Sequence, residues 1–338
     1  MPGGGLLCTC NIFTIDYYTG YYDRGAATYG VAARRYCPLG GPLPAFVTEG
    51  IPFESCAYLD NSESKNKMLS LRVSSAAGKE IRPSGTVGNS IAELIAKVVE
   101  GTTPKAGVAI QFATDVTANS GGHDHHDASR PKGALAPTTG VTDANGEVRF
   151  RFSATQISGV HNITATCNDC VNKTADEKVT VKVPDLVNIF QLPFRDSQWA
   201  YPGIGQTGEH SDNHYVTVSA ATRMLDISRK FQKIWPTAPK LTLNDASLVW
   251  GGKFDIKGTW ERNPKAHAEH RIGDNMDIRA NSAPGAIPPK IRAAVFRWLN
   301  DESLPEDNVP VDLVIDSVSP LWENPGDTNE HFHLRLGK

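Results

Sequence analysis

Three residues in the C-terminal part of the chain have the side chains of a catalytic zinc centre: His270, Asp277 and His333. Such a centre takes three protein ligands from His, Asp, Glu or Cys and keeps one position open for water or substrate. His270 and Asp277 are seven positions apart, so an unbroken strand would direct them to opposite faces. A turn must lie between them, and Gly-Asp-Asn at 273–275 has the residue types for one. Residues 276–278 then read as a short strand that returns Asp277 toward His270.

The residues around His333 predict a second strand, which would contain a zinc ligand and a further catalytic residue. The histidines at 331 and 333 alternate with apolar residues, which is the period of a half-buried strand. His331 therefore shares the face of His333, where it would act as a general base or as a donor to the developing oxyanion. Glu330 falls on the opposite face of a regular strand but turns inward if it precedes the strand, so it stays the rival base. His267 would contact the oxyanion or orient the substrate.

These motifs resemble those of a group of zinc peptidases. The pattern His-x-x-Gly-x-x-x-Asp at 270–277, followed by His-x-His at 331–333, is similar to the pattern shared by lysostaphin, the D-Ala-D-Ala carboxypeptidases and the hedgehog N-terminal domain. Residues 267–277 look closest to the penicillin-insensitive murein endopeptidases. The preceding residues 248–255 are similar to the strand and glycine turn ahead of the first ligand in that family.

The resemblance implies that Zn²⁺ is bound by the three ligands named above, with His267 and His331 beside the metal. It also implies hydrolysis of an amide bond in a peptide of peptidoglycan, by an endopeptidase or a carboxypeptidase. Ala268 and Phe332 stand where the D-Ala-D-Ala enzymes usually have Ser and Trp, so their dipeptide specificity does not transfer. No His-Glu-x-x-His occurs, which excludes the helix-borne zinc site of the commoner metalloproteases.

Two other functions stay open. A surface adhesin or binding protein would contain a non-catalytic zinc domain, as the signalling branch of the same group does. A zinc hydrolase of a small dipeptide or another amide would keep the metal chemistry without acting on the cell wall.

Further polar clusters are candidate sites. The segment Gly-Gly-His-Asp-His-His-Asp at 121–127 predicts either a secondary metal loop or an ordinary exposed loop, and its ligands would be His123, His125 and His126.

Residues 209–215 precede a predicted helix. His214 or His210 would line the cleft, or else these residues help to cap the helix. Arg271, next to the first ligand, is a second candidate for substrate binding.

Composition limits the function and the compartment. The 338 residues include 34 Lys and Arg against 37 Asp and Glu, a balance that gives no indication of a nucleic-acid partner. No apolar run reaches the ~20 residues that cross a bilayer, so no transmembrane segment is expected. Six cysteines favour disulfides in a secreted or cell-envelope protein, with Cys167 and Cys170 as a local pair. The competing interpretation is a structural zinc on four thiolates.

The sequence predicts a multidomain chain: an all-β immunoglobulin-like sandwich followed by an α+β zinc-peptidase domain with a central antiparallel sheet. Residues 1–65 form a small Cys- and Tyr-rich unit, 66–184 the sandwich, 185–205 a linker, and 206–338 the zinc-peptidase domain.

The sandwich is predicted from alternating strands at 69–73, 148–152 and 179–183, with 90–99 also read as a strand. The turn at 142–147 and the strands around it resemble the bacterial immunoglobulin-like domains of intimin and invasin, which serve spacing or adhesion.

In the C-terminal domain the apolar period predicts one helix from 218 that ends before Pro236 and another over 288–299. Residues 311–315 are predicted to form a strand in the same sheet as the final His-x-His strand.

Overall fold

The computed structural model describes residues 66–193, 199, 210, 212–255, 260, 269–281, 285–300, 313, 315–316 and 318–337, together with the backbone of 23–24 and 27–28. The latter are two short antiparallel strands, β2 (Asp23–Arg24) and β3 (Ala27–Thr28). The rest of the predicted N-terminal unit, with its four cysteines, lies outside the described residues.

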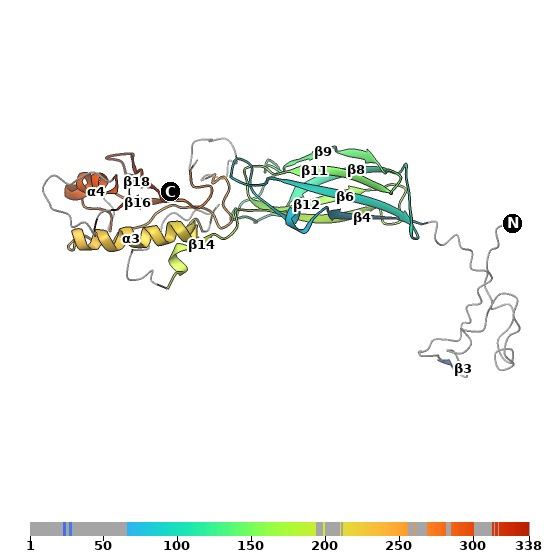
Figure 1. Cartoon of the computed structure of the whole chain (residues 1–338), viewed down its shortest axis with the longest axis horizontal. Coiled ribbons are helices and arrows are strands. Elements are labelled where there is room, and N and C mark those ends of the chain that lie inside the picture. The colour runs from blue at the N-terminus through green and yellow to red at the C-terminus, as the bar shows by residue number, and fades with distance from the viewer. Residues whose placement is uncertain are drawn as a thin grey trace, which may run out of the picture.

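Residues 67–181 form a sandwich of two β-sheets (Figure 1). One sheet has the strand order β10-β8-β12-β13-β5, and the other has the order β4-β6-β11-β9 with β7 paired to β6. All these pairs are antiparallel except β13 with β5. The elements are β4 (Lys67–Val73), η4 (Ala76–Lys79), β5 (Glu80–Ile81), β6 (Ile91–Glu100), β7 (Thr103–Pro104), β8 (Ala109–Val116), β9 (Ala134–Ala136), β10 (Thr139–Val141), β11 (Glu147–Ser153), β12 (Gly159–Thr166) and β13 (Thr174–Val181). The predicted β-sandwich, including the strand at 90–99, is confirmed.

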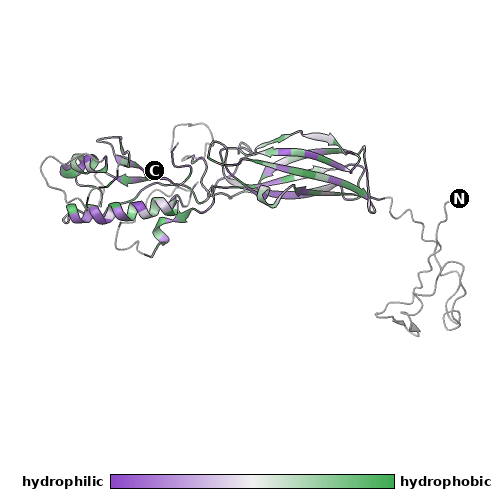
Figure 2. Ribbon diagram, in the orientation of Figure 1, coloured by the Kyte–Doolittle hydropathy of each residue, from purple (hydrophilic) through white to green (hydrophobic). Residues whose placement is uncertain are grey.

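Alternation of apolar and polar side chains builds the sandwich, as the banded strands of Figure 2 show. In β11, Val148, Phe150 and Phe152 are buried while the residues between them face outward. Phe150 stacks on Phe112 of the other sheet, with ring centroids 3.8 Å apart. One continuous core therefore joins the two sheets.

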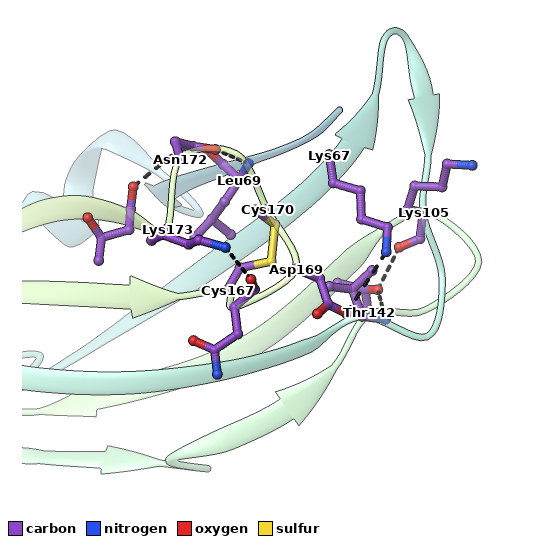
Figure 3. The surroundings of a disulfide bond; sticks show 12 residues. Lys67, Leu69, Lys105, Thr142, Cys167, Asp169, Cys170, Asn172 and Lys173 are labelled. Atoms are coloured by element: carbon purple, nitrogen blue, oxygen red, sulfur yellow. Dashed lines mark hydrogen bonds and ion pairs between the residues drawn. A yellow bond between two sulfur atoms is a disulfide. The ribbon is translucent and has the colours of Figure 1, made fainter. Parts of the chain in front are cut away.

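A disulfide and an asparagine close the connection between β12 and β13 (Figure 3). Cys167 and Cys170 are bonded, which confirms the predicted local pair. The side chain of Asn172 accepts from the backbone N–H of Leu69 at 2.8 Å and donates to its carbonyl at 2.7 Å. This connection is thereby fixed to β4 in the other sheet.

In the residues that the structure describes, the C-terminal part combines short strands with the helices α3 and α4. Its elements are β14 (Val187–Asn188), η5 (Ile189–Gln191), β15 (Tyr215–Val216), α3 (Val218–Ile234), β16 (Asn275–Arg279), η6 (Pro289–Ile291), α4 (Arg292–Leu299), β17 (Leu321–Glu323) and β18 (His331–Arg335). Thr217 caps α3 by accepting from the N–H of Ala220 at 3.1 Å, and the helix ends before Pro236 as predicted. In the described part of the chain, no helix is long and apolar enough to span a membrane.

Strands β16, β18 and β17 form an antiparallel three-stranded sheet with β18 in the centre. The strand predicted over 311–315 is wrong where the structure describes it. Leu313 lies in a 3₁₀ turn and Ile315 in no strand, although both are buried. The Leu313 carbonyl accepts a hydrogen bond from the Trp298 indole at 3.1 Å. An apolar run can pack against a core without strand pairing, and periodicity does not separate the two cases.

The sandwich and the C-terminal part lie end to end (Figure 1) and are joined by backbone hydrogen bonds. Lys253 N–H donates to the Gln156 carbonyl at 2.7 Å, and Val183 N–H donates to the Trp250 carbonyl at 2.8 Å. Residues 248–255, expected as a strand and glycine turn, contain the glycine turn but no strand; their β-pairing is limited to the isolated bridge between Gly252 and Ile157.

Gly273 is expected to tolerate no side chain. Its φ is +79°, and a Cβ would lie 2.5 Å from Leu186 Cδ2 and 3.0 Å from the Thr217 amide nitrogen. The change Gly273→Ala combines left-handed backbone strain, roughly 1–3 kcal/mol, with this clash. It should therefore lower the melting temperature measured by calorimetry.

Gly326→Ala is the matched control, because Gly326 has a φ of +87° and no atom within 4 Å of a Cβ. Equal losses in melting temperature for the two variants would show that the packing around Gly273 contributes nothing.

Candidate metal centre

His270, Asp277 and His333 converge as the sequence predicts. The Oδ1 atom of Asp277 lies 2.8 Å from His333 Nδ1 and 3.3 Å from His270 Nε2. These three atoms all lie within 4.8 Å of one another, and the three residues are 1–5% exposed. Two imidazole nitrogens and one carboxylate oxygen are a donor set that divalent transition metals accept, so these residues could hold a metal.

Strand register creates this convergence. Asp277 on β16 is directly opposite His333 on β18. Their neighbours Ile278 and Phe332 point to the other face of the sheet and are fully buried in the core of the C-terminal part. Because alternate residues share a face, burial of the apolar residues forces Asp277 and His333 together on the opposite side. His270 reaches the same point from the turn that contains Gly273.

The electrostatics of the cluster keep Asp277 ionised. Burial by itself would raise the pKa of Asp277, but His270 and His333 hold it well below its usual range. Burial would lower the pKa of His270, yet the Asp277 carboxylate more than offsets this effect and raises it. A buried carboxylate is stable only with such partners, and a bound cation is another partner of the same kind.

The second ring nitrogen of His333 faces a polar shell that the sequence analysis did not find. His333 Nε2 lies 3.3 Å from the Asn275 side-chain amide and 3.6 Å from Glu269 Oε2. Arg335 binds the Glu269 carboxylate through two hydrogen bonds of 2.5 and 2.6 Å. Such outer partners orient a ligating histidine. Asn275 is two residues from Asp277, and Arg335 is two residues from His333, so strand alternation puts both on the face of the ligands and could have predicted them.

His331 lies on the ligand face beside Asp277, as predicted. Its Nε2 is 3.5 Å from Asp277 Oδ2 and 3.9 Å from Glu323 Oε2. Its Nδ1 is 2.7 Å from the carbonyl of Asn329, so the N–H on this nitrogen donates to that oxygen. In the neutral ring the lone pair is then on Nε2, toward the metal cluster. Glu323, opposite His331 on β17, was not singled out by the sequence analysis.

Glu330 does not join the cluster, in contrast to its sequence-based role as rival base. Its Oε1 accepts from the Trp322 indole at 2.8 Å, and its Oε2 pairs with Arg292 at 2.8 Å. Both oxygens are therefore engaged away from the ligands, and Glu330 is buried. The residue follows the regular strand alternation, which puts it on the face opposite to His331.

The two residues predicted to bind substrate, Arg271 and His214, do not lie at the surface of the metal cluster. Arg271 donates to Gln156 Oε1 at 2.7 Å, which places its guanidinium at the sandwich instead of at the metal cluster. His214 is 1% exposed, with Nδ1 3.3 Å from Asp212 Oδ1 and its ring against Phe190. His267 lies outside the described residues.

Asp245 is a buried acid near the cluster that the sequence analysis also missed. Burial and the charge of Asp277 raise the pKa of Asp245 to about 6. Asn213 donates to its Oδ1 at 2.5 Å, and the backbone N–H of Asp277 donates to its carbonyl at 2.9 Å. It therefore supports the strand that contains the ligand.

A second cluster contains His123, His125, His210 and Asp255, whose ligand atoms lie within 4.8 Å of one another. The loop at 121–127 thus contributes two of its three predicted histidines, whereas His126 is exposed and outside the cluster. Burial lowers the pKa of His123 to about 4 and also lowers that of His125. Both rings are neutral at pH 7, which is the form that binds metals.

Comparisons with known proteins identify no family for this chain. No family model matches it, and no curated protein is similar to it. Among solved structures, the D0–D1 domains of intimin are 15% identical over 35% of this chain and 50% of that one, with a TM-score of 0.24. The adhesin InvE of Yersinia pseudotuberculosis is 14% identical over 55% and 61%, with a TM-score of 0.32. The Escherichia coli adhesin FdeC is 10% identical over 37% and 33%, with a TM-score of 0.23. The chain covers less than two thirds of each.

Replacing Glu269 by Gln should weaken metal binding at the first cluster. The change removes the charge that faces His333 Nε2 and keeps the size of the side chain. Loss of such an outer partner typically costs about 10–100-fold in metal affinity. The affinity is measured by competition with a chelator in an Asp255→Ala background, so that only the first cluster titrates.

Asp226→Asn serves as the control, because Asp226 pairs with Lys230 on the surface of α3. Unchanged affinity in Glu269→Gln would show that this carboxylate does not support the ligand.

Proposed function

We propose that this chain is a zinc-dependent amide hydrolase that cleaves peptides of peptidoglycan as an endopeptidase or carboxypeptidase. The observation that supports the proposal is a buried set of three ligands with an unliganded histidine, His331, on the same strand face. Three protein ligands leave a fourth position for water or substrate, which is the arrangement of catalytic zinc sites.

The roles of the residues follow from their contacts. When bound, zinc supplies Lewis acidity and makes water a nucleophile near neutral pH. His331 accepts a proton from the attacking water through Nε2, because its Nδ1–H is held by the Asn329 carbonyl. The same nitrogen then returns the proton to the leaving amine. Glu330 is not available as the base, since Arg292 and Trp322 occupy its two oxygens.

The substrate class rests on the resemblance of the ligand motifs to murein endopeptidases, and the compartment rests on the disulfide. A bond between Cys167 and Cys170 suits an oxidising environment, such as the cell envelope or the exterior. Peptidoglycan is a substrate of that compartment. We therefore propose that the protein is secreted or located in the cell envelope.

A surface binding protein with a non-catalytic zinc site is the second candidate function. The end-to-end arrangement of the sandwich and the C-terminal part favours it, because this shape suits a spacer that presents a terminal domain (Figure 1). The solved structures reported above are domains of adhesins, a likeness that concerns the fold alone.

Replacing His331 by Ala should strongly reduce turnover and leave the metal in place. Loss of a general base typically lowers the rate about 10²–10⁴-fold. His333→Ala should lose both turnover and the metal of the first cluster. The assay is release of soluble peptides from purified peptidoglycan, with zinc measured by elemental analysis of the same preparations.

The outcomes separate the candidate functions. Zinc bound to the first cluster without release of any wall peptide by the parent chain contradicts the hydrolase of peptidoglycan. Cleavage of small dipeptides alone would then indicate another amide substrate, and no cleavage at all would favour the binding protein.

Replacing Glu330 by Gln distinguishes the two candidate bases. The variant leaves the partly buried Arg292 without its charged partner, so it should lower thermal stability. Its activity per folded molecule should stay within about tenfold of the parent, because Glu330 does not face the ligands. A loss as large as that of His331→Ala would assign the base to Glu330.

A further inference from the structure

We propose that His123, His125, His210 and Asp255 form a second metal site, a closed structural zinc site that fastens the β-sandwich to the C-terminal part. Two of these ligands come from the loop between β8 and β9, and the other two come from the C-terminal part. This site is separate from the first cluster and does not depend on the proposed hydrolase activity.

The ligand atoms have the spacing of a tetrahedron around zinc. Zn–N and Zn–O bonds of roughly 2.0–2.1 Å place neighbouring ligand atoms about 3.3 Å apart in a tetrahedron. His210 Nε2 lies 3.2 Å from His123 Nδ1 and 3.1 Å from Asp255 Oδ1. Asp255 Oδ1 also lies 3.3 Å from His123 Nδ1 and 3.5 Å from His125 Nε2. Four of the six distances between these atoms are thus 3.1–3.5 Å, and all four atoms lie within 4.8 Å of one another.

The number of ligands indicates a structural role. Three histidines and one carboxylate fill all four positions of a tetrahedral zinc, which leaves none for water or substrate. The first cluster has only three ligands, with His331 beside them. His123 and His210 are fully buried, and the side chain of His125 is 14% exposed. The second site is thus shielded as well as closed.

Hydrogen bonding among the four side chains explains their arrangement less well than a metal does. His123 Nδ1 and His210 Nε2 face each other, so at most one of the two can direct a proton at the other. His125 Nε2 is buried and makes no hydrogen bond in the described structure, yet it lies 3.5 Å from Asp255 Oδ1. A cation at the centre would engage every one of these lone pairs.

Trp260 holds the carboxylate and covers the cluster. Its backbone N–H donates to Asp255 Oδ2 at 2.6 Å, which leaves Oδ1 for the metal. Its ring lies on the ring of His125, with centroids 4.0 Å apart, and its indole donates to Asp127 at 3.1 Å. Trp260 has a φ of +53°, a costly conformation for a bulky residue. This backbone conformation allows Trp260 to contact both Asp255 and His125.

The site lies where the two parts of the chain meet. Next to it, the Ser158 hydroxyl donates to the Gly251 carbonyl at 2.8 Å, and a Cβ on Gly122 would lie 3.1 Å from Val249 Cγ1. A metal that binds residues from both sides would add strong bonds to this contact. It would hold the segment 248–255 against the sandwich, and that segment leads toward the turn of His270.

Metal content of purified protein tests the proposal. The parent chain should bind two zinc ions, and Asp255→Ala and His125→Ala should each bind one. His333→Ala should also bind one, and the double variant Asp255→Ala, His333→Ala should bind none. His126→Ala is the matched control from the same loop and should keep both ions, because His126 lies outside the cluster.

Two further measurements cover variants that fold poorly. Metal-free parent and metal-free His333→Ala are titrated with Co²⁺, whose absorption reports a tetrahedral site. His333→Ala should show one saturable tetrahedral site, and the parent should bind a second equivalent of Co²⁺ at the first cluster. Amide exchange in 119–130 and 248–255 should become faster when zinc is removed from His333→Ala. No zinc in His333→Ala, or unchanged exchange on removal, would overturn the proposal.

Discussion

The ionised carboxylate of Asp277 is the constraint on which the C-terminal part depends. It lies inside the protein, 1% exposed, where an unpaired charge would be costly. His270 and His333 lie 3.3 and 2.8 Å from its Oδ1 atom and stabilise the charge. A strand that buried Asp277 without these rings would be unstable, so the ligand set and the local fold require each other.

The sheet that positions these residues has three strands, and burial of its other face stabilises it. Met276, Ile278, Phe332 and Leu334 pack into a core shared with α3 and α4. A three-stranded sheet needs such cover for stability. Because the apolar residues alternate with the ligands, the hydrophobic effect that buries one face also sets the register that pairs Asp277 with His333. Packing and site geometry therefore follow from one pattern.

The two histidine clusters illustrate how the number of ligands separates possible roles. The first has three ligands, an outer shell of Glu269 and Arg335, and an additional histidine whose free lone pair faces inward. The second has four ligands drawn from both parts of the chain. A set of three ligands would leave a fourth metal position for water or substrate, whereas a set of four would fill the metal's coordination sphere.

Local periodicity predicted the strands of the sandwich and the strand of His331 and His333, and it contributed to the prediction of the first cluster. The alternation in 148–152 and 331–335 predicted buried faces, and the glycine at 273 predicted the turn that allows His270 and Asp277 to meet. The same alternation placed Glu330 on the face opposite to His331, which the structure has. The apolar run at 311–315 shows the limit, since burial without strand pairing leaves the same sequence signal.

By itself, then, the sequence determined the β-sandwich, the disulfide between Cys167 and Cys170, and the meeting of His270, Asp277 and His333, because each depends on residues close in sequence or on strand period. Only the tertiary structure decided that His210 and Asp255 join His123 and His125, and that Arg271 faces the sandwich. These contacts form between segments far apart in the chain, 87 residues in the case of His123 and His210. Local sequence patterns do not predict contacts over such a separation, because these contacts depend on how the two parts of the chain pack against each other.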